Sequence, residues 1–194
     1  LEWIEENNRY EIRDVIGPDE YKEHVDNNAY TNYMAHENMR LAAQVIACIR
    51  DEKKDIYGKM QKLMREEGTS LEQLEEELKD KMKKLYLPQP DEKTGIIPQF
   101  DGYFDIQEID LSVYKRQVGT VFHDYSGEDV QGMQAGKQAD IVELLYQMED
   151  ITTPDNKAKN YVYYEARTLH DSSLSKAIHS ITACDLGMEK EAYE

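Results

Sequence analysis

The sequence predicts an all-α fold. Apolar residues recur at spacings of three and four over several long segments, and almost no stretch alternates apolar and polar residues with a period of two. Long polar loops separate the periodic segments, so antiparallel helices would carry their loops at one end of each pair. This arrangement is typical of part of a helical barrel.

The first helices are predicted in the first half of the chain. Residues 1–8 are interpreted as the end of a helix. The next helix is predicted over residues 31–50, with an apolar stripe made of Met34, Leu41, Val45, Cys48 and Ile49. Another is predicted over residues 52–66, and Gly68 ends it.

A capping box starts the following helix. Ser70 is followed three residues later by Gln73, and an apolar stripe continues over residues 70–86. The stripe is too short for a sustained heptad repeat, which favours packing in a core over a coiled coil. The charged, amphipathic stretch 52–86 leaves open one further class of function, a non-catalytic helical interaction module.

The second half of the chain alternates loops with shorter helices. Helices are predicted over residues 107–118, 137–148 and 173–186. Residues 150–160 are interpreted as a polar segment, and residues 161–173 as extended or irregular chain.

Composition limits the class of partner. The chain has 194 residues, with 40 acidic and 23 basic residues and a formal net charge of −17, so it would repel nucleic acid and anionic membrane surfaces. It shows neither a signal peptide nor a long apolar run, so we expect a cytoplasmic protein without a membrane span. Cys48 and Cys184 lie far apart in apolar patterns and are interpreted as reduced core thiols. The sequence opens without Met and ends within a helical pattern, so we expect it to be part of a longer protein.

Two loops combine polar groups that could act on a substrate. In "GPDEYKEHVDNN", residues 17–28, repulsion between adjacent Asp19 and Glu20 could keep a proton on one carboxyl, as a general acid requires. In "GKQAD", Lys137 and Gln138 offer a cation and an amide to hydroxyls or to an anion. A charged surface turn and an exposed Lys-Gln pair are the structural alternatives for these two loops.

A third loop, "TLHDSSLS", places Ser172 and Ser173 at or near a helix N-terminus, directly after His170 and Asp171. Hydroxyls, backbone N–H groups and the helix dipole together suit phosphate, although such a serine also serves as a plain helix cap. The sequence contains no zinc, phosphate-loop or dinucleotide motif.

Several blocks occur in the order of a known family. The segments "VIGPDEYKEHVDNNAYTN", "LYLPQPDEKTGIIPQFDGYFD", "KQADIVELLY" and "YYEARTLHDSSLSKAIHSI" closely resemble glycoside hydrolase family 65, the family of disaccharide phosphorylases. The resemblance implies an (α/α)₆ barrel, of which residues 1–194 would form a partial catalytic domain. The family's amino-terminal β-sandwich, its carboxy-terminal part and its phosphate-binding histidine would lie outside this chain.

The resemblance also implies a reaction. Glu20 matches the family's general acid, which would protonate the glycosidic oxygen of an α-linked glucosyl disaccharide. Phosphate would attack the anomeric carbon from the opposite face and give β-glucose 1-phosphate with inversion. We therefore expect Glu20 to be a buried proton donor, with Tyr21 and Asn28 beside it.

The same resemblance assigns binding roles. Lys137 and Gln138 match the family's substrate-binding pair, and the counterparts of Ser172–Ser173 bind phosphate. Glu165 matches a glutamate that holds glucose hydroxyls, although Ala166 stands where the family often has proline. We expect these residues to converge at one end of the helical bundle.

The implied partners are small molecules, a disaccharide and inorganic phosphate as co-substrate. No cofactor and no metal are expected, and family phosphorylases are commonly homodimers. The alternative within the family is a hydrolase of the trehalase kind, which would use water and a glutamate base beyond this chain.

Overall fold

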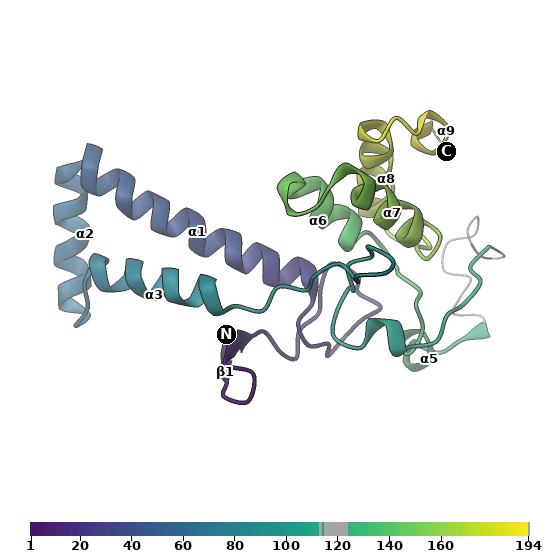
Figure 1. The fold of residues 1–194 in the computed structure, drawn as a ribbon, viewed down its shortest axis with the longest axis horizontal. Coiled ribbons are helices and arrows are strands. Elements are labelled where there is room, and N and C mark those ends of the chain that lie inside the picture. The colour runs from purple at the N-terminus through teal and green to yellow at the C-terminus, as the bar shows by residue number, and fades with distance from the viewer. Residues whose placement is uncertain (113, 115–123, 194) are drawn as a thin grey trace. The chain divides into compact units, whose positions relative to one another are not determined.

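The structure is a computed structural model that describes residues 1–112, 114 and 124–193. The chain is mostly helical, which confirms the predicted class, and its described residues contain one sheet of two strands (Figure 1). None of the helices in the described part is long and apolar enough to cross a membrane.

The chain forms two compact units. The first contains Leu1–Glu11 and Asn32–Tyr86, and the second contains Ile12–Thr31 and Leu87–Glu194. The second unit holds every site residue that the sequence predicts: Glu20, Lys137, Gln138, Glu165, Ser172 and Ser173.

The first unit opens with a β-hairpin. Strands β1 (Glu2–Ile4) and β2 (Arg9–Glu11) are antiparallel, with Trp3 opposite Tyr10 and the two ring centroids 4.9 Å apart. The prediction that the chain begins with the end of a helix is wrong. Asn8 takes a left-handed backbone conformation, with a φ of 49°, and the aromatic cross-strand pair stabilises the strands.

Three predicted helices of this unit are confirmed. They are α1 (Ala29–Glu52), of which the unit contains all but the first turn, α2 (Lys54–Glu66) and α3 (Leu71–Lys84). The Ser70 hydroxyl caps α3 by accepting from the Gln73 N–H at 3.1 Å. An Arg50–Glu75 ion pair of 2.6 Å links α1 to α3.

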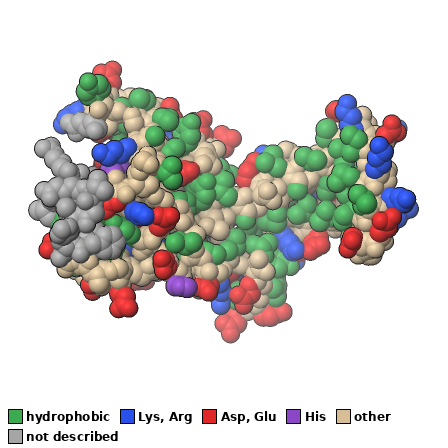
Figure 2. Space-filling view, turned by 180° about the vertical axis from the view of Figure 1, so that it is seen from behind, with side chains coloured by type: hydrophobic (Ala, Val, Ile, Leu, Met, Phe, Trp, Pro, Cys, Tyr) green, Lys and Arg blue, Asp and Glu red, His purple; other side chains and the backbone are tan. Residues whose placement is uncertain are grey.

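The apolar stripe that the sequence predicts for the packed face of α1 is partly exposed. Leu41, Val45 and Cys48 face solvent, and Figure 2 shows apolar side chains on the surface of these helices. The buried apolar residues of α1 within this unit are Tyr33, Met39, Ala43 and Ile46. Helix α1 carries apolar residues on more than one face. The spacing of these residues therefore did not identify the face that packs against the rest of the unit. Cys184 is also exposed, so the interpretation of both cysteines as core thiols is wrong.

The second unit contains shorter helices and long loops. Its described α-helices are α5 (Gly127–Gln131), α6 (Ile141–Gln147), α7 (Pro154–Glu165), α8 (Ser173–Asp185) and α9 (Glu189–Tyr193). Two 3₁₀ turns cover Tyr103–Asp105 and Glu149–Ile151. Helices α6 and α8 confirm two predictions. Helix α6 begins only at Ile141, because the backbone N–H groups of Lys137 and Ala139 donate to the side chains of Asp19 and Ser175 instead.

The short helix predicted over residues 107–118 is not observed where the chain is described. Gln107 pairs with Met133, donating its N–H to the Gly132 carbonyl oxygen at 3.0 Å and accepting from the Gln134 N–H at 2.7 Å. Residues 113 and 115–118 of this prediction lie outside the described residues.

The interpretation of residues 150–160 as a polar segment and of residues 161–173 as extended or irregular chain is wrong in part, because helix α7 covers part of both segments. Thr153 caps it by accepting from the Asn156 N–H at 3.2 Å, and Pro154 occupies the first turn, where a missing N–H costs nothing. Its buried face includes Asn160, which is fully buried, accepts from the Ile97 N–H at 2.9 Å and donates to the Gly95 carbonyl oxygen at 2.9 Å. Because polar residues lie on the buried face of α7, the sequence shows no apolar residues at helical spacing there.

Candidate functional site

The loop that carries Glu20 lies against the segment that starts at Lys137. The Lys137 ammonium group donates to the Glu20 carboxylate, although the two residues are 117 positions apart. Beside them, the Gln138 side-chain amide donates to the Pro18 carbonyl oxygen. The fold therefore brings three of the predicted site residues together.

Glu20 itself is not buried. Its side chain is 54% exposed and that of Lys137 is 30% exposed, so the expectation of a buried Glu20 is wrong for this chain. The buried carboxylate is its neighbour Asp19, at 1% exposure. Tyr21 and Asn28 are buried as well, and their side chains donate to the carboxylates of Asp171 and Asp140, respectively.

The Asp19 carboxylate holds both segments in place. Its Oδ1 accepts from the backbone N–H of Lys137 at 2.8 Å and from that of Tyr21 at 3.2 Å, and its Oδ2 accepts from the Gln99 amide at 3.1 Å. Hydrogen bonds to an ionised acceptor are about twice as strong as neutral ones. The residue next to Glu20 therefore positions the backbone of Lys137 directly.

A second buried carboxylate, Asp140, lies next to Asp19. Its Oδ2 accepts from the Asn28 amide at 3.0 Å and from the Gln99 amide at 3.3 Å. Burial raises the pKa of Asp140 to about 7, the hydrogen bond from Asn28 opposes this rise, and the charge of Asp19 adds to it. Burial also raises the pKa of Asp19, against the opposing charge of Lys22.

The third predicted loop joins the same network. The Asp171 N–H donates to the Lys137 carbonyl oxygen at 3.0 Å, and the Tyr21 hydroxyl donates to the Asp171 carboxylate at 2.6 Å. Ser172 is the N-cap of α8, where its hydroxyl accepts a backbone N–H at 3.3 Å, and Ser173 is the first helical residue. The serine pair therefore lies at a helix start, as predicted, directly after a residue bonded to the Lys137 segment.

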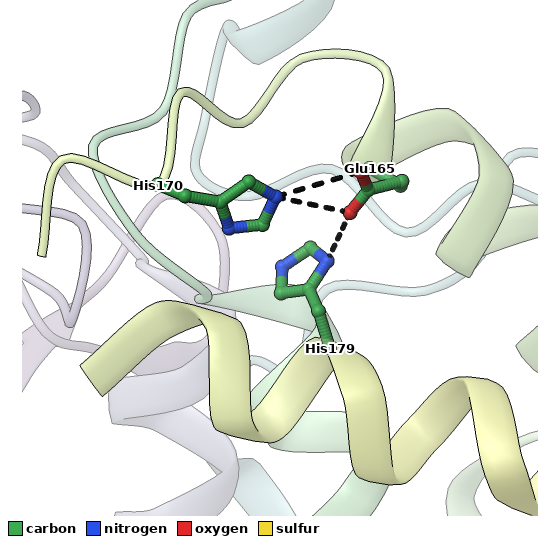
Figure 3. Close-up of side chains that lie close together, drawn as sticks. All are labelled: Glu165, His170 and His179. Carbon is green, nitrogen blue, oxygen red and sulfur yellow. Dashed lines mark hydrogen bonds and ion pairs between the residues drawn. The ribbon is translucent and has the colours of Figure 1, made fainter. Parts of the chain in front are cut away.

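Glu165 lies at the end of α7 and forms a cluster with two histidines (Figure 3). Its Oε2 lies 2.6 Å from His179 Nδ1 and 3.2 Å from His170 Nε2. Sequence reasoning did not assign a role to either histidine. His170 directly precedes the "DSS" segment and could have been selected from that position, whereas no pattern in the sequence marks His179.

Comparisons with known proteins show to which family the chain belongs. Residues 1–194 match the family model described as the glycosyl hydrolase family 65 central catalytic domain. The chain belongs to this family. Its relatives include the kojibiose phosphorylase of Halothermothrix orenii, 45% identical over 194 residues, and that of Escherichia coli K12, 40% identical over 192 residues. The nigerose phosphorylase of Lachnoclostridium phytofermentans is 34% identical over 186 residues.

The alignments cover nearly all of this chain but a minor part of each relative. They span 100%, 97% and 95% of this chain, and 24%, 23% and 24% of the three relatives in the same order. A solved structure from the human microbiome, assigned as a kojibiose phosphorylase, superposes with a TM-score of 0.80 at 31% identity. It covers 98% of this chain, which covers 25% of it. The chain thus spans about a quarter of a family 65 protein, and its helical fold agrees with the family's helical-barrel catalytic domain.

Gly17 tests the close packing behind the Glu20 loop. A Cβ at Gly17 would lie 2.4 Å from Asn28 Nδ2 and 2.7 Å from Asp140 Oδ2. We expect Gly17→Ala to lower the free energy of unfolding by about 1–3 kcal/mol, since both neighbours are fully or nearly fully buried and hydrogen-bonded. Denaturant unfolding of the whole protein measures this change.

Gly58 provides the matched control. It lies within α2, and a Cβ there would meet nothing within 4 Å. Gly58→Ala should raise the free energy of unfolding by roughly 0.5–1 kcal/mol through helix propensity. Equal effects of the two substitutions would contradict the packing described around Gly17.

Proposed function

We propose that the protein containing this chain catalyses the phosphorolysis of an α-glucosyl disaccharide, with inversion, to β-glucose 1-phosphate and a free sugar. Kojibiose is the first substrate to test, since the relatives with 45% and 40% identity are kojibiose phosphorylases. In this proposal Glu20 is the general acid, and Lys137, Gln138 and Glu165 bind the sugar. Ser172 and Ser173 bind phosphate, which serves as the nucleophile without a cofactor.

One observation carries the proposal. The loop with Glu20 and the start of α8 are both bonded to the Lys137 segment, the first through Asp19 and the second through Asp171. A proton donor, a cation and a helix N-terminus are thereby gathered in the second unit. An inverting hydrolase needs a second carboxylate to activate water, whereas phosphate is already a nucleophilic anion and needs a set of hydrogen-bond donors.

The Glu20–Lys137 contact suggests how substrate binding prepares the acid. The Lys137 ammonium group donates a hydrogen bond to the Glu20 carboxylate. A general acid must instead carry a proton. In the proposed cycle Lys137 exchanges this carboxylate for groups of the bound substrates, and Glu20 then holds the proton that it passes to the glycosidic oxygen.

The charge balance explains why phosphate needs donors at short range. The chain carries a formal charge of −17, so its long-range field is unfavourable for a phosphate dianion. Hydroxyls and backbone N–H groups at the start of α8 can bind the anion without adding a cation beside the acid. The phosphate is then held by local hydrogen bonds and the helix dipole.

The proposed reaction is tested by its dependence on phosphate. The whole protein should release glucose 1-phosphate from a disaccharide in a panel of kojibiose, nigerose, maltose and trehalose, and only when phosphate is present. Glu20→Gln should lower kcat by at least about a hundredfold, since general acid catalysis contributes that much or more.

Three outcomes would contradict this proposal. Release of free glucose alone, independent of phosphate, would indicate a hydrolase of the trehalase kind. Normal turnover of the Glu20→Gln variant would remove Glu20 as the acid. Absence of turnover on every sugar would favour the helical interaction module.

The serine pair is tested separately. Replacing Ser172 and Ser173 together by alanine should raise the apparent KM for phosphate by at least about tenfold, because hydrogen bonds to a charged partner contribute roughly 1.5–3 kcal/mol each. The KM for the disaccharide should change much less. If both KM values rise equally, or if that for phosphate does not rise, the pair serves only as a helix cap.

A further inference from the structure

The Glu165 cluster joins three parts of the second unit. Glu165 ends α7, His170 lies in the loop that follows, and His179 lies in the middle of α8. Figure 3 shows both imidazole rings pointing toward the same carboxylate. His170 approaches both carboxylate oxygens, at 3.2 and 3.4 Å, and His179 approaches Oε2 at 2.6 Å.

Burial differs across the cluster in a way that points to a ligand. The side chain of His179 is 4% exposed, that of His170 is 12% exposed, and that of Glu165 is 29% exposed. The carboxylate therefore reaches solvent while the histidines lie behind it. All three line a cavity of about 860 Å³ between α7, α8 and α9.

His170 is itself fixed in position. Its backbone takes the left-handed conformation, with a φ of 56°, which is uncommon for a residue with a side chain. Its Nδ1 lies 2.9 Å from the Ser175 hydroxyl, which also accepts the Ala139 N–H at 3.1 Å. This chain of contacts ties the ring to the segment that carries Lys137, and it suits the tautomer with the proton on Nε2, directed at Glu165.

The histidines control the charge of the carboxylate. Burial by itself would raise the pKa of Glu165, but the hydrogen bonds and charges of His170 and His179 outweigh burial and hold that pKa well below its usual value. The other titratable groups that line the cavity are Tyr161, Lys176, Glu191 and Tyr193. An ionised carboxylate only accepts hydrogen bonds, so it suits hydroxyl donors.

We infer that His170 and His179 are positioning residues, which hold the Glu165 carboxylate ionised and oriented to accept hydrogen bonds from the hydroxyls of the transferred sugar. The inference rests on the proposed sugar-binding role of Glu165 and adds the two residues that make it effective. His179 supplies the firmest contact from the buried side, and His170 fixes the carboxylate plane by approaching both oxygens. Fixing a binding group before the sugar arrives reduces the entropy lost on binding.

The inference is tested by kinetics of the whole protein with three substitutions. His179→Leu removes the donor, and His179→Asn keeps a side-chain N–H near the position of Nδ1. We expect His179→Leu to raise the KM for the disaccharide by at least about tenfold, as loss of a charge-assisted hydrogen bond would. The KM for phosphate should stay within about twofold, and His179→Asn should restore much of the loss. His36→Asn, in the first unit, serves as the control and should match the unchanged protein.

The pH profile separates positioning from a merely structural role. Removal of the His179 donor lets the pKa of Glu165 rise, so Glu165 becomes protonated at a higher pH. The acid limb of kcat/KM for the disaccharide should therefore move to higher pH in His179→Leu, and less in His179→Asn. An unmoved acid limb, or equal rises of both KM values, would overturn the inference.

Glu165→Gln separates this inference from the proposed function. If this variant keeps the disaccharide KM, the sugar-binding role of Glu165 is lost and the inference is lost with it. If Glu165→Gln raises that KM while His179→Leu changes neither the KM nor the pH profile, only the inference about the histidines is overturned. A rise in both variants supports the two together.

Discussion

The candidate site depends on the buried carboxylate of Asp19. Its Oδ1 accepts backbone N–H groups from two segments far apart in sequence, those of Tyr21 and Lys137. Glu20 lies between Asp19 and Tyr21, so the same interaction that anchors its loop also fixes the segment of its cationic partner. The cost is a carboxylate buried in the protein interior, which the charge of Lys22 and several hydrogen-bond donors offset. The Gln99 amide is one of them, and it also binds the neighbouring Asp140.

Outward from this anchor, backbone hydrogen bonds extend the network to the remaining site residues. Lys137 accepts from the Asp171 N–H, which sets the start of α8, and Gly136 exchanges two hydrogen bonds with the chain around Thr168. The Ser175 hydroxyl accepts from the Ala139 N–H and contacts His170. His170 in turn contacts Glu165. Glu20, Lys137, the start of α8 and Glu165 are thus connected through one continuous set of contacts, as the proposal that they act on one substrate requires.

The sequence predicted the helices whose apolar face is regular, but not those with polar groups in the core. The caps at Ser70 and Ser172 were visible because they obey local rules. Helix α7 was missed because buried Asn160 satisfies distant backbone groups, which leaves no apolar period to detect. Glu20 does lie beside Lys137, but its burial was predicted wrongly. Which of two adjacent carboxylates turns inward depends on donors from Gln99 and Lys137, and no local pattern reveals such long-range partners.

The central claim is that Asp19 acts by placing Lys137 and Glu20, and a double-mutant cycle tests it most directly. Glucose 1-phosphate release by the whole protein would be measured for Asp19→Ala, for Lys137→Ala and for both together, with circular dichroism to verify folding. If Asp19 works through Lys137, the double variant should lose little more kcat/KM than Asp19→Ala alone. Losses that multiply, as for two independent residues, would contradict the account.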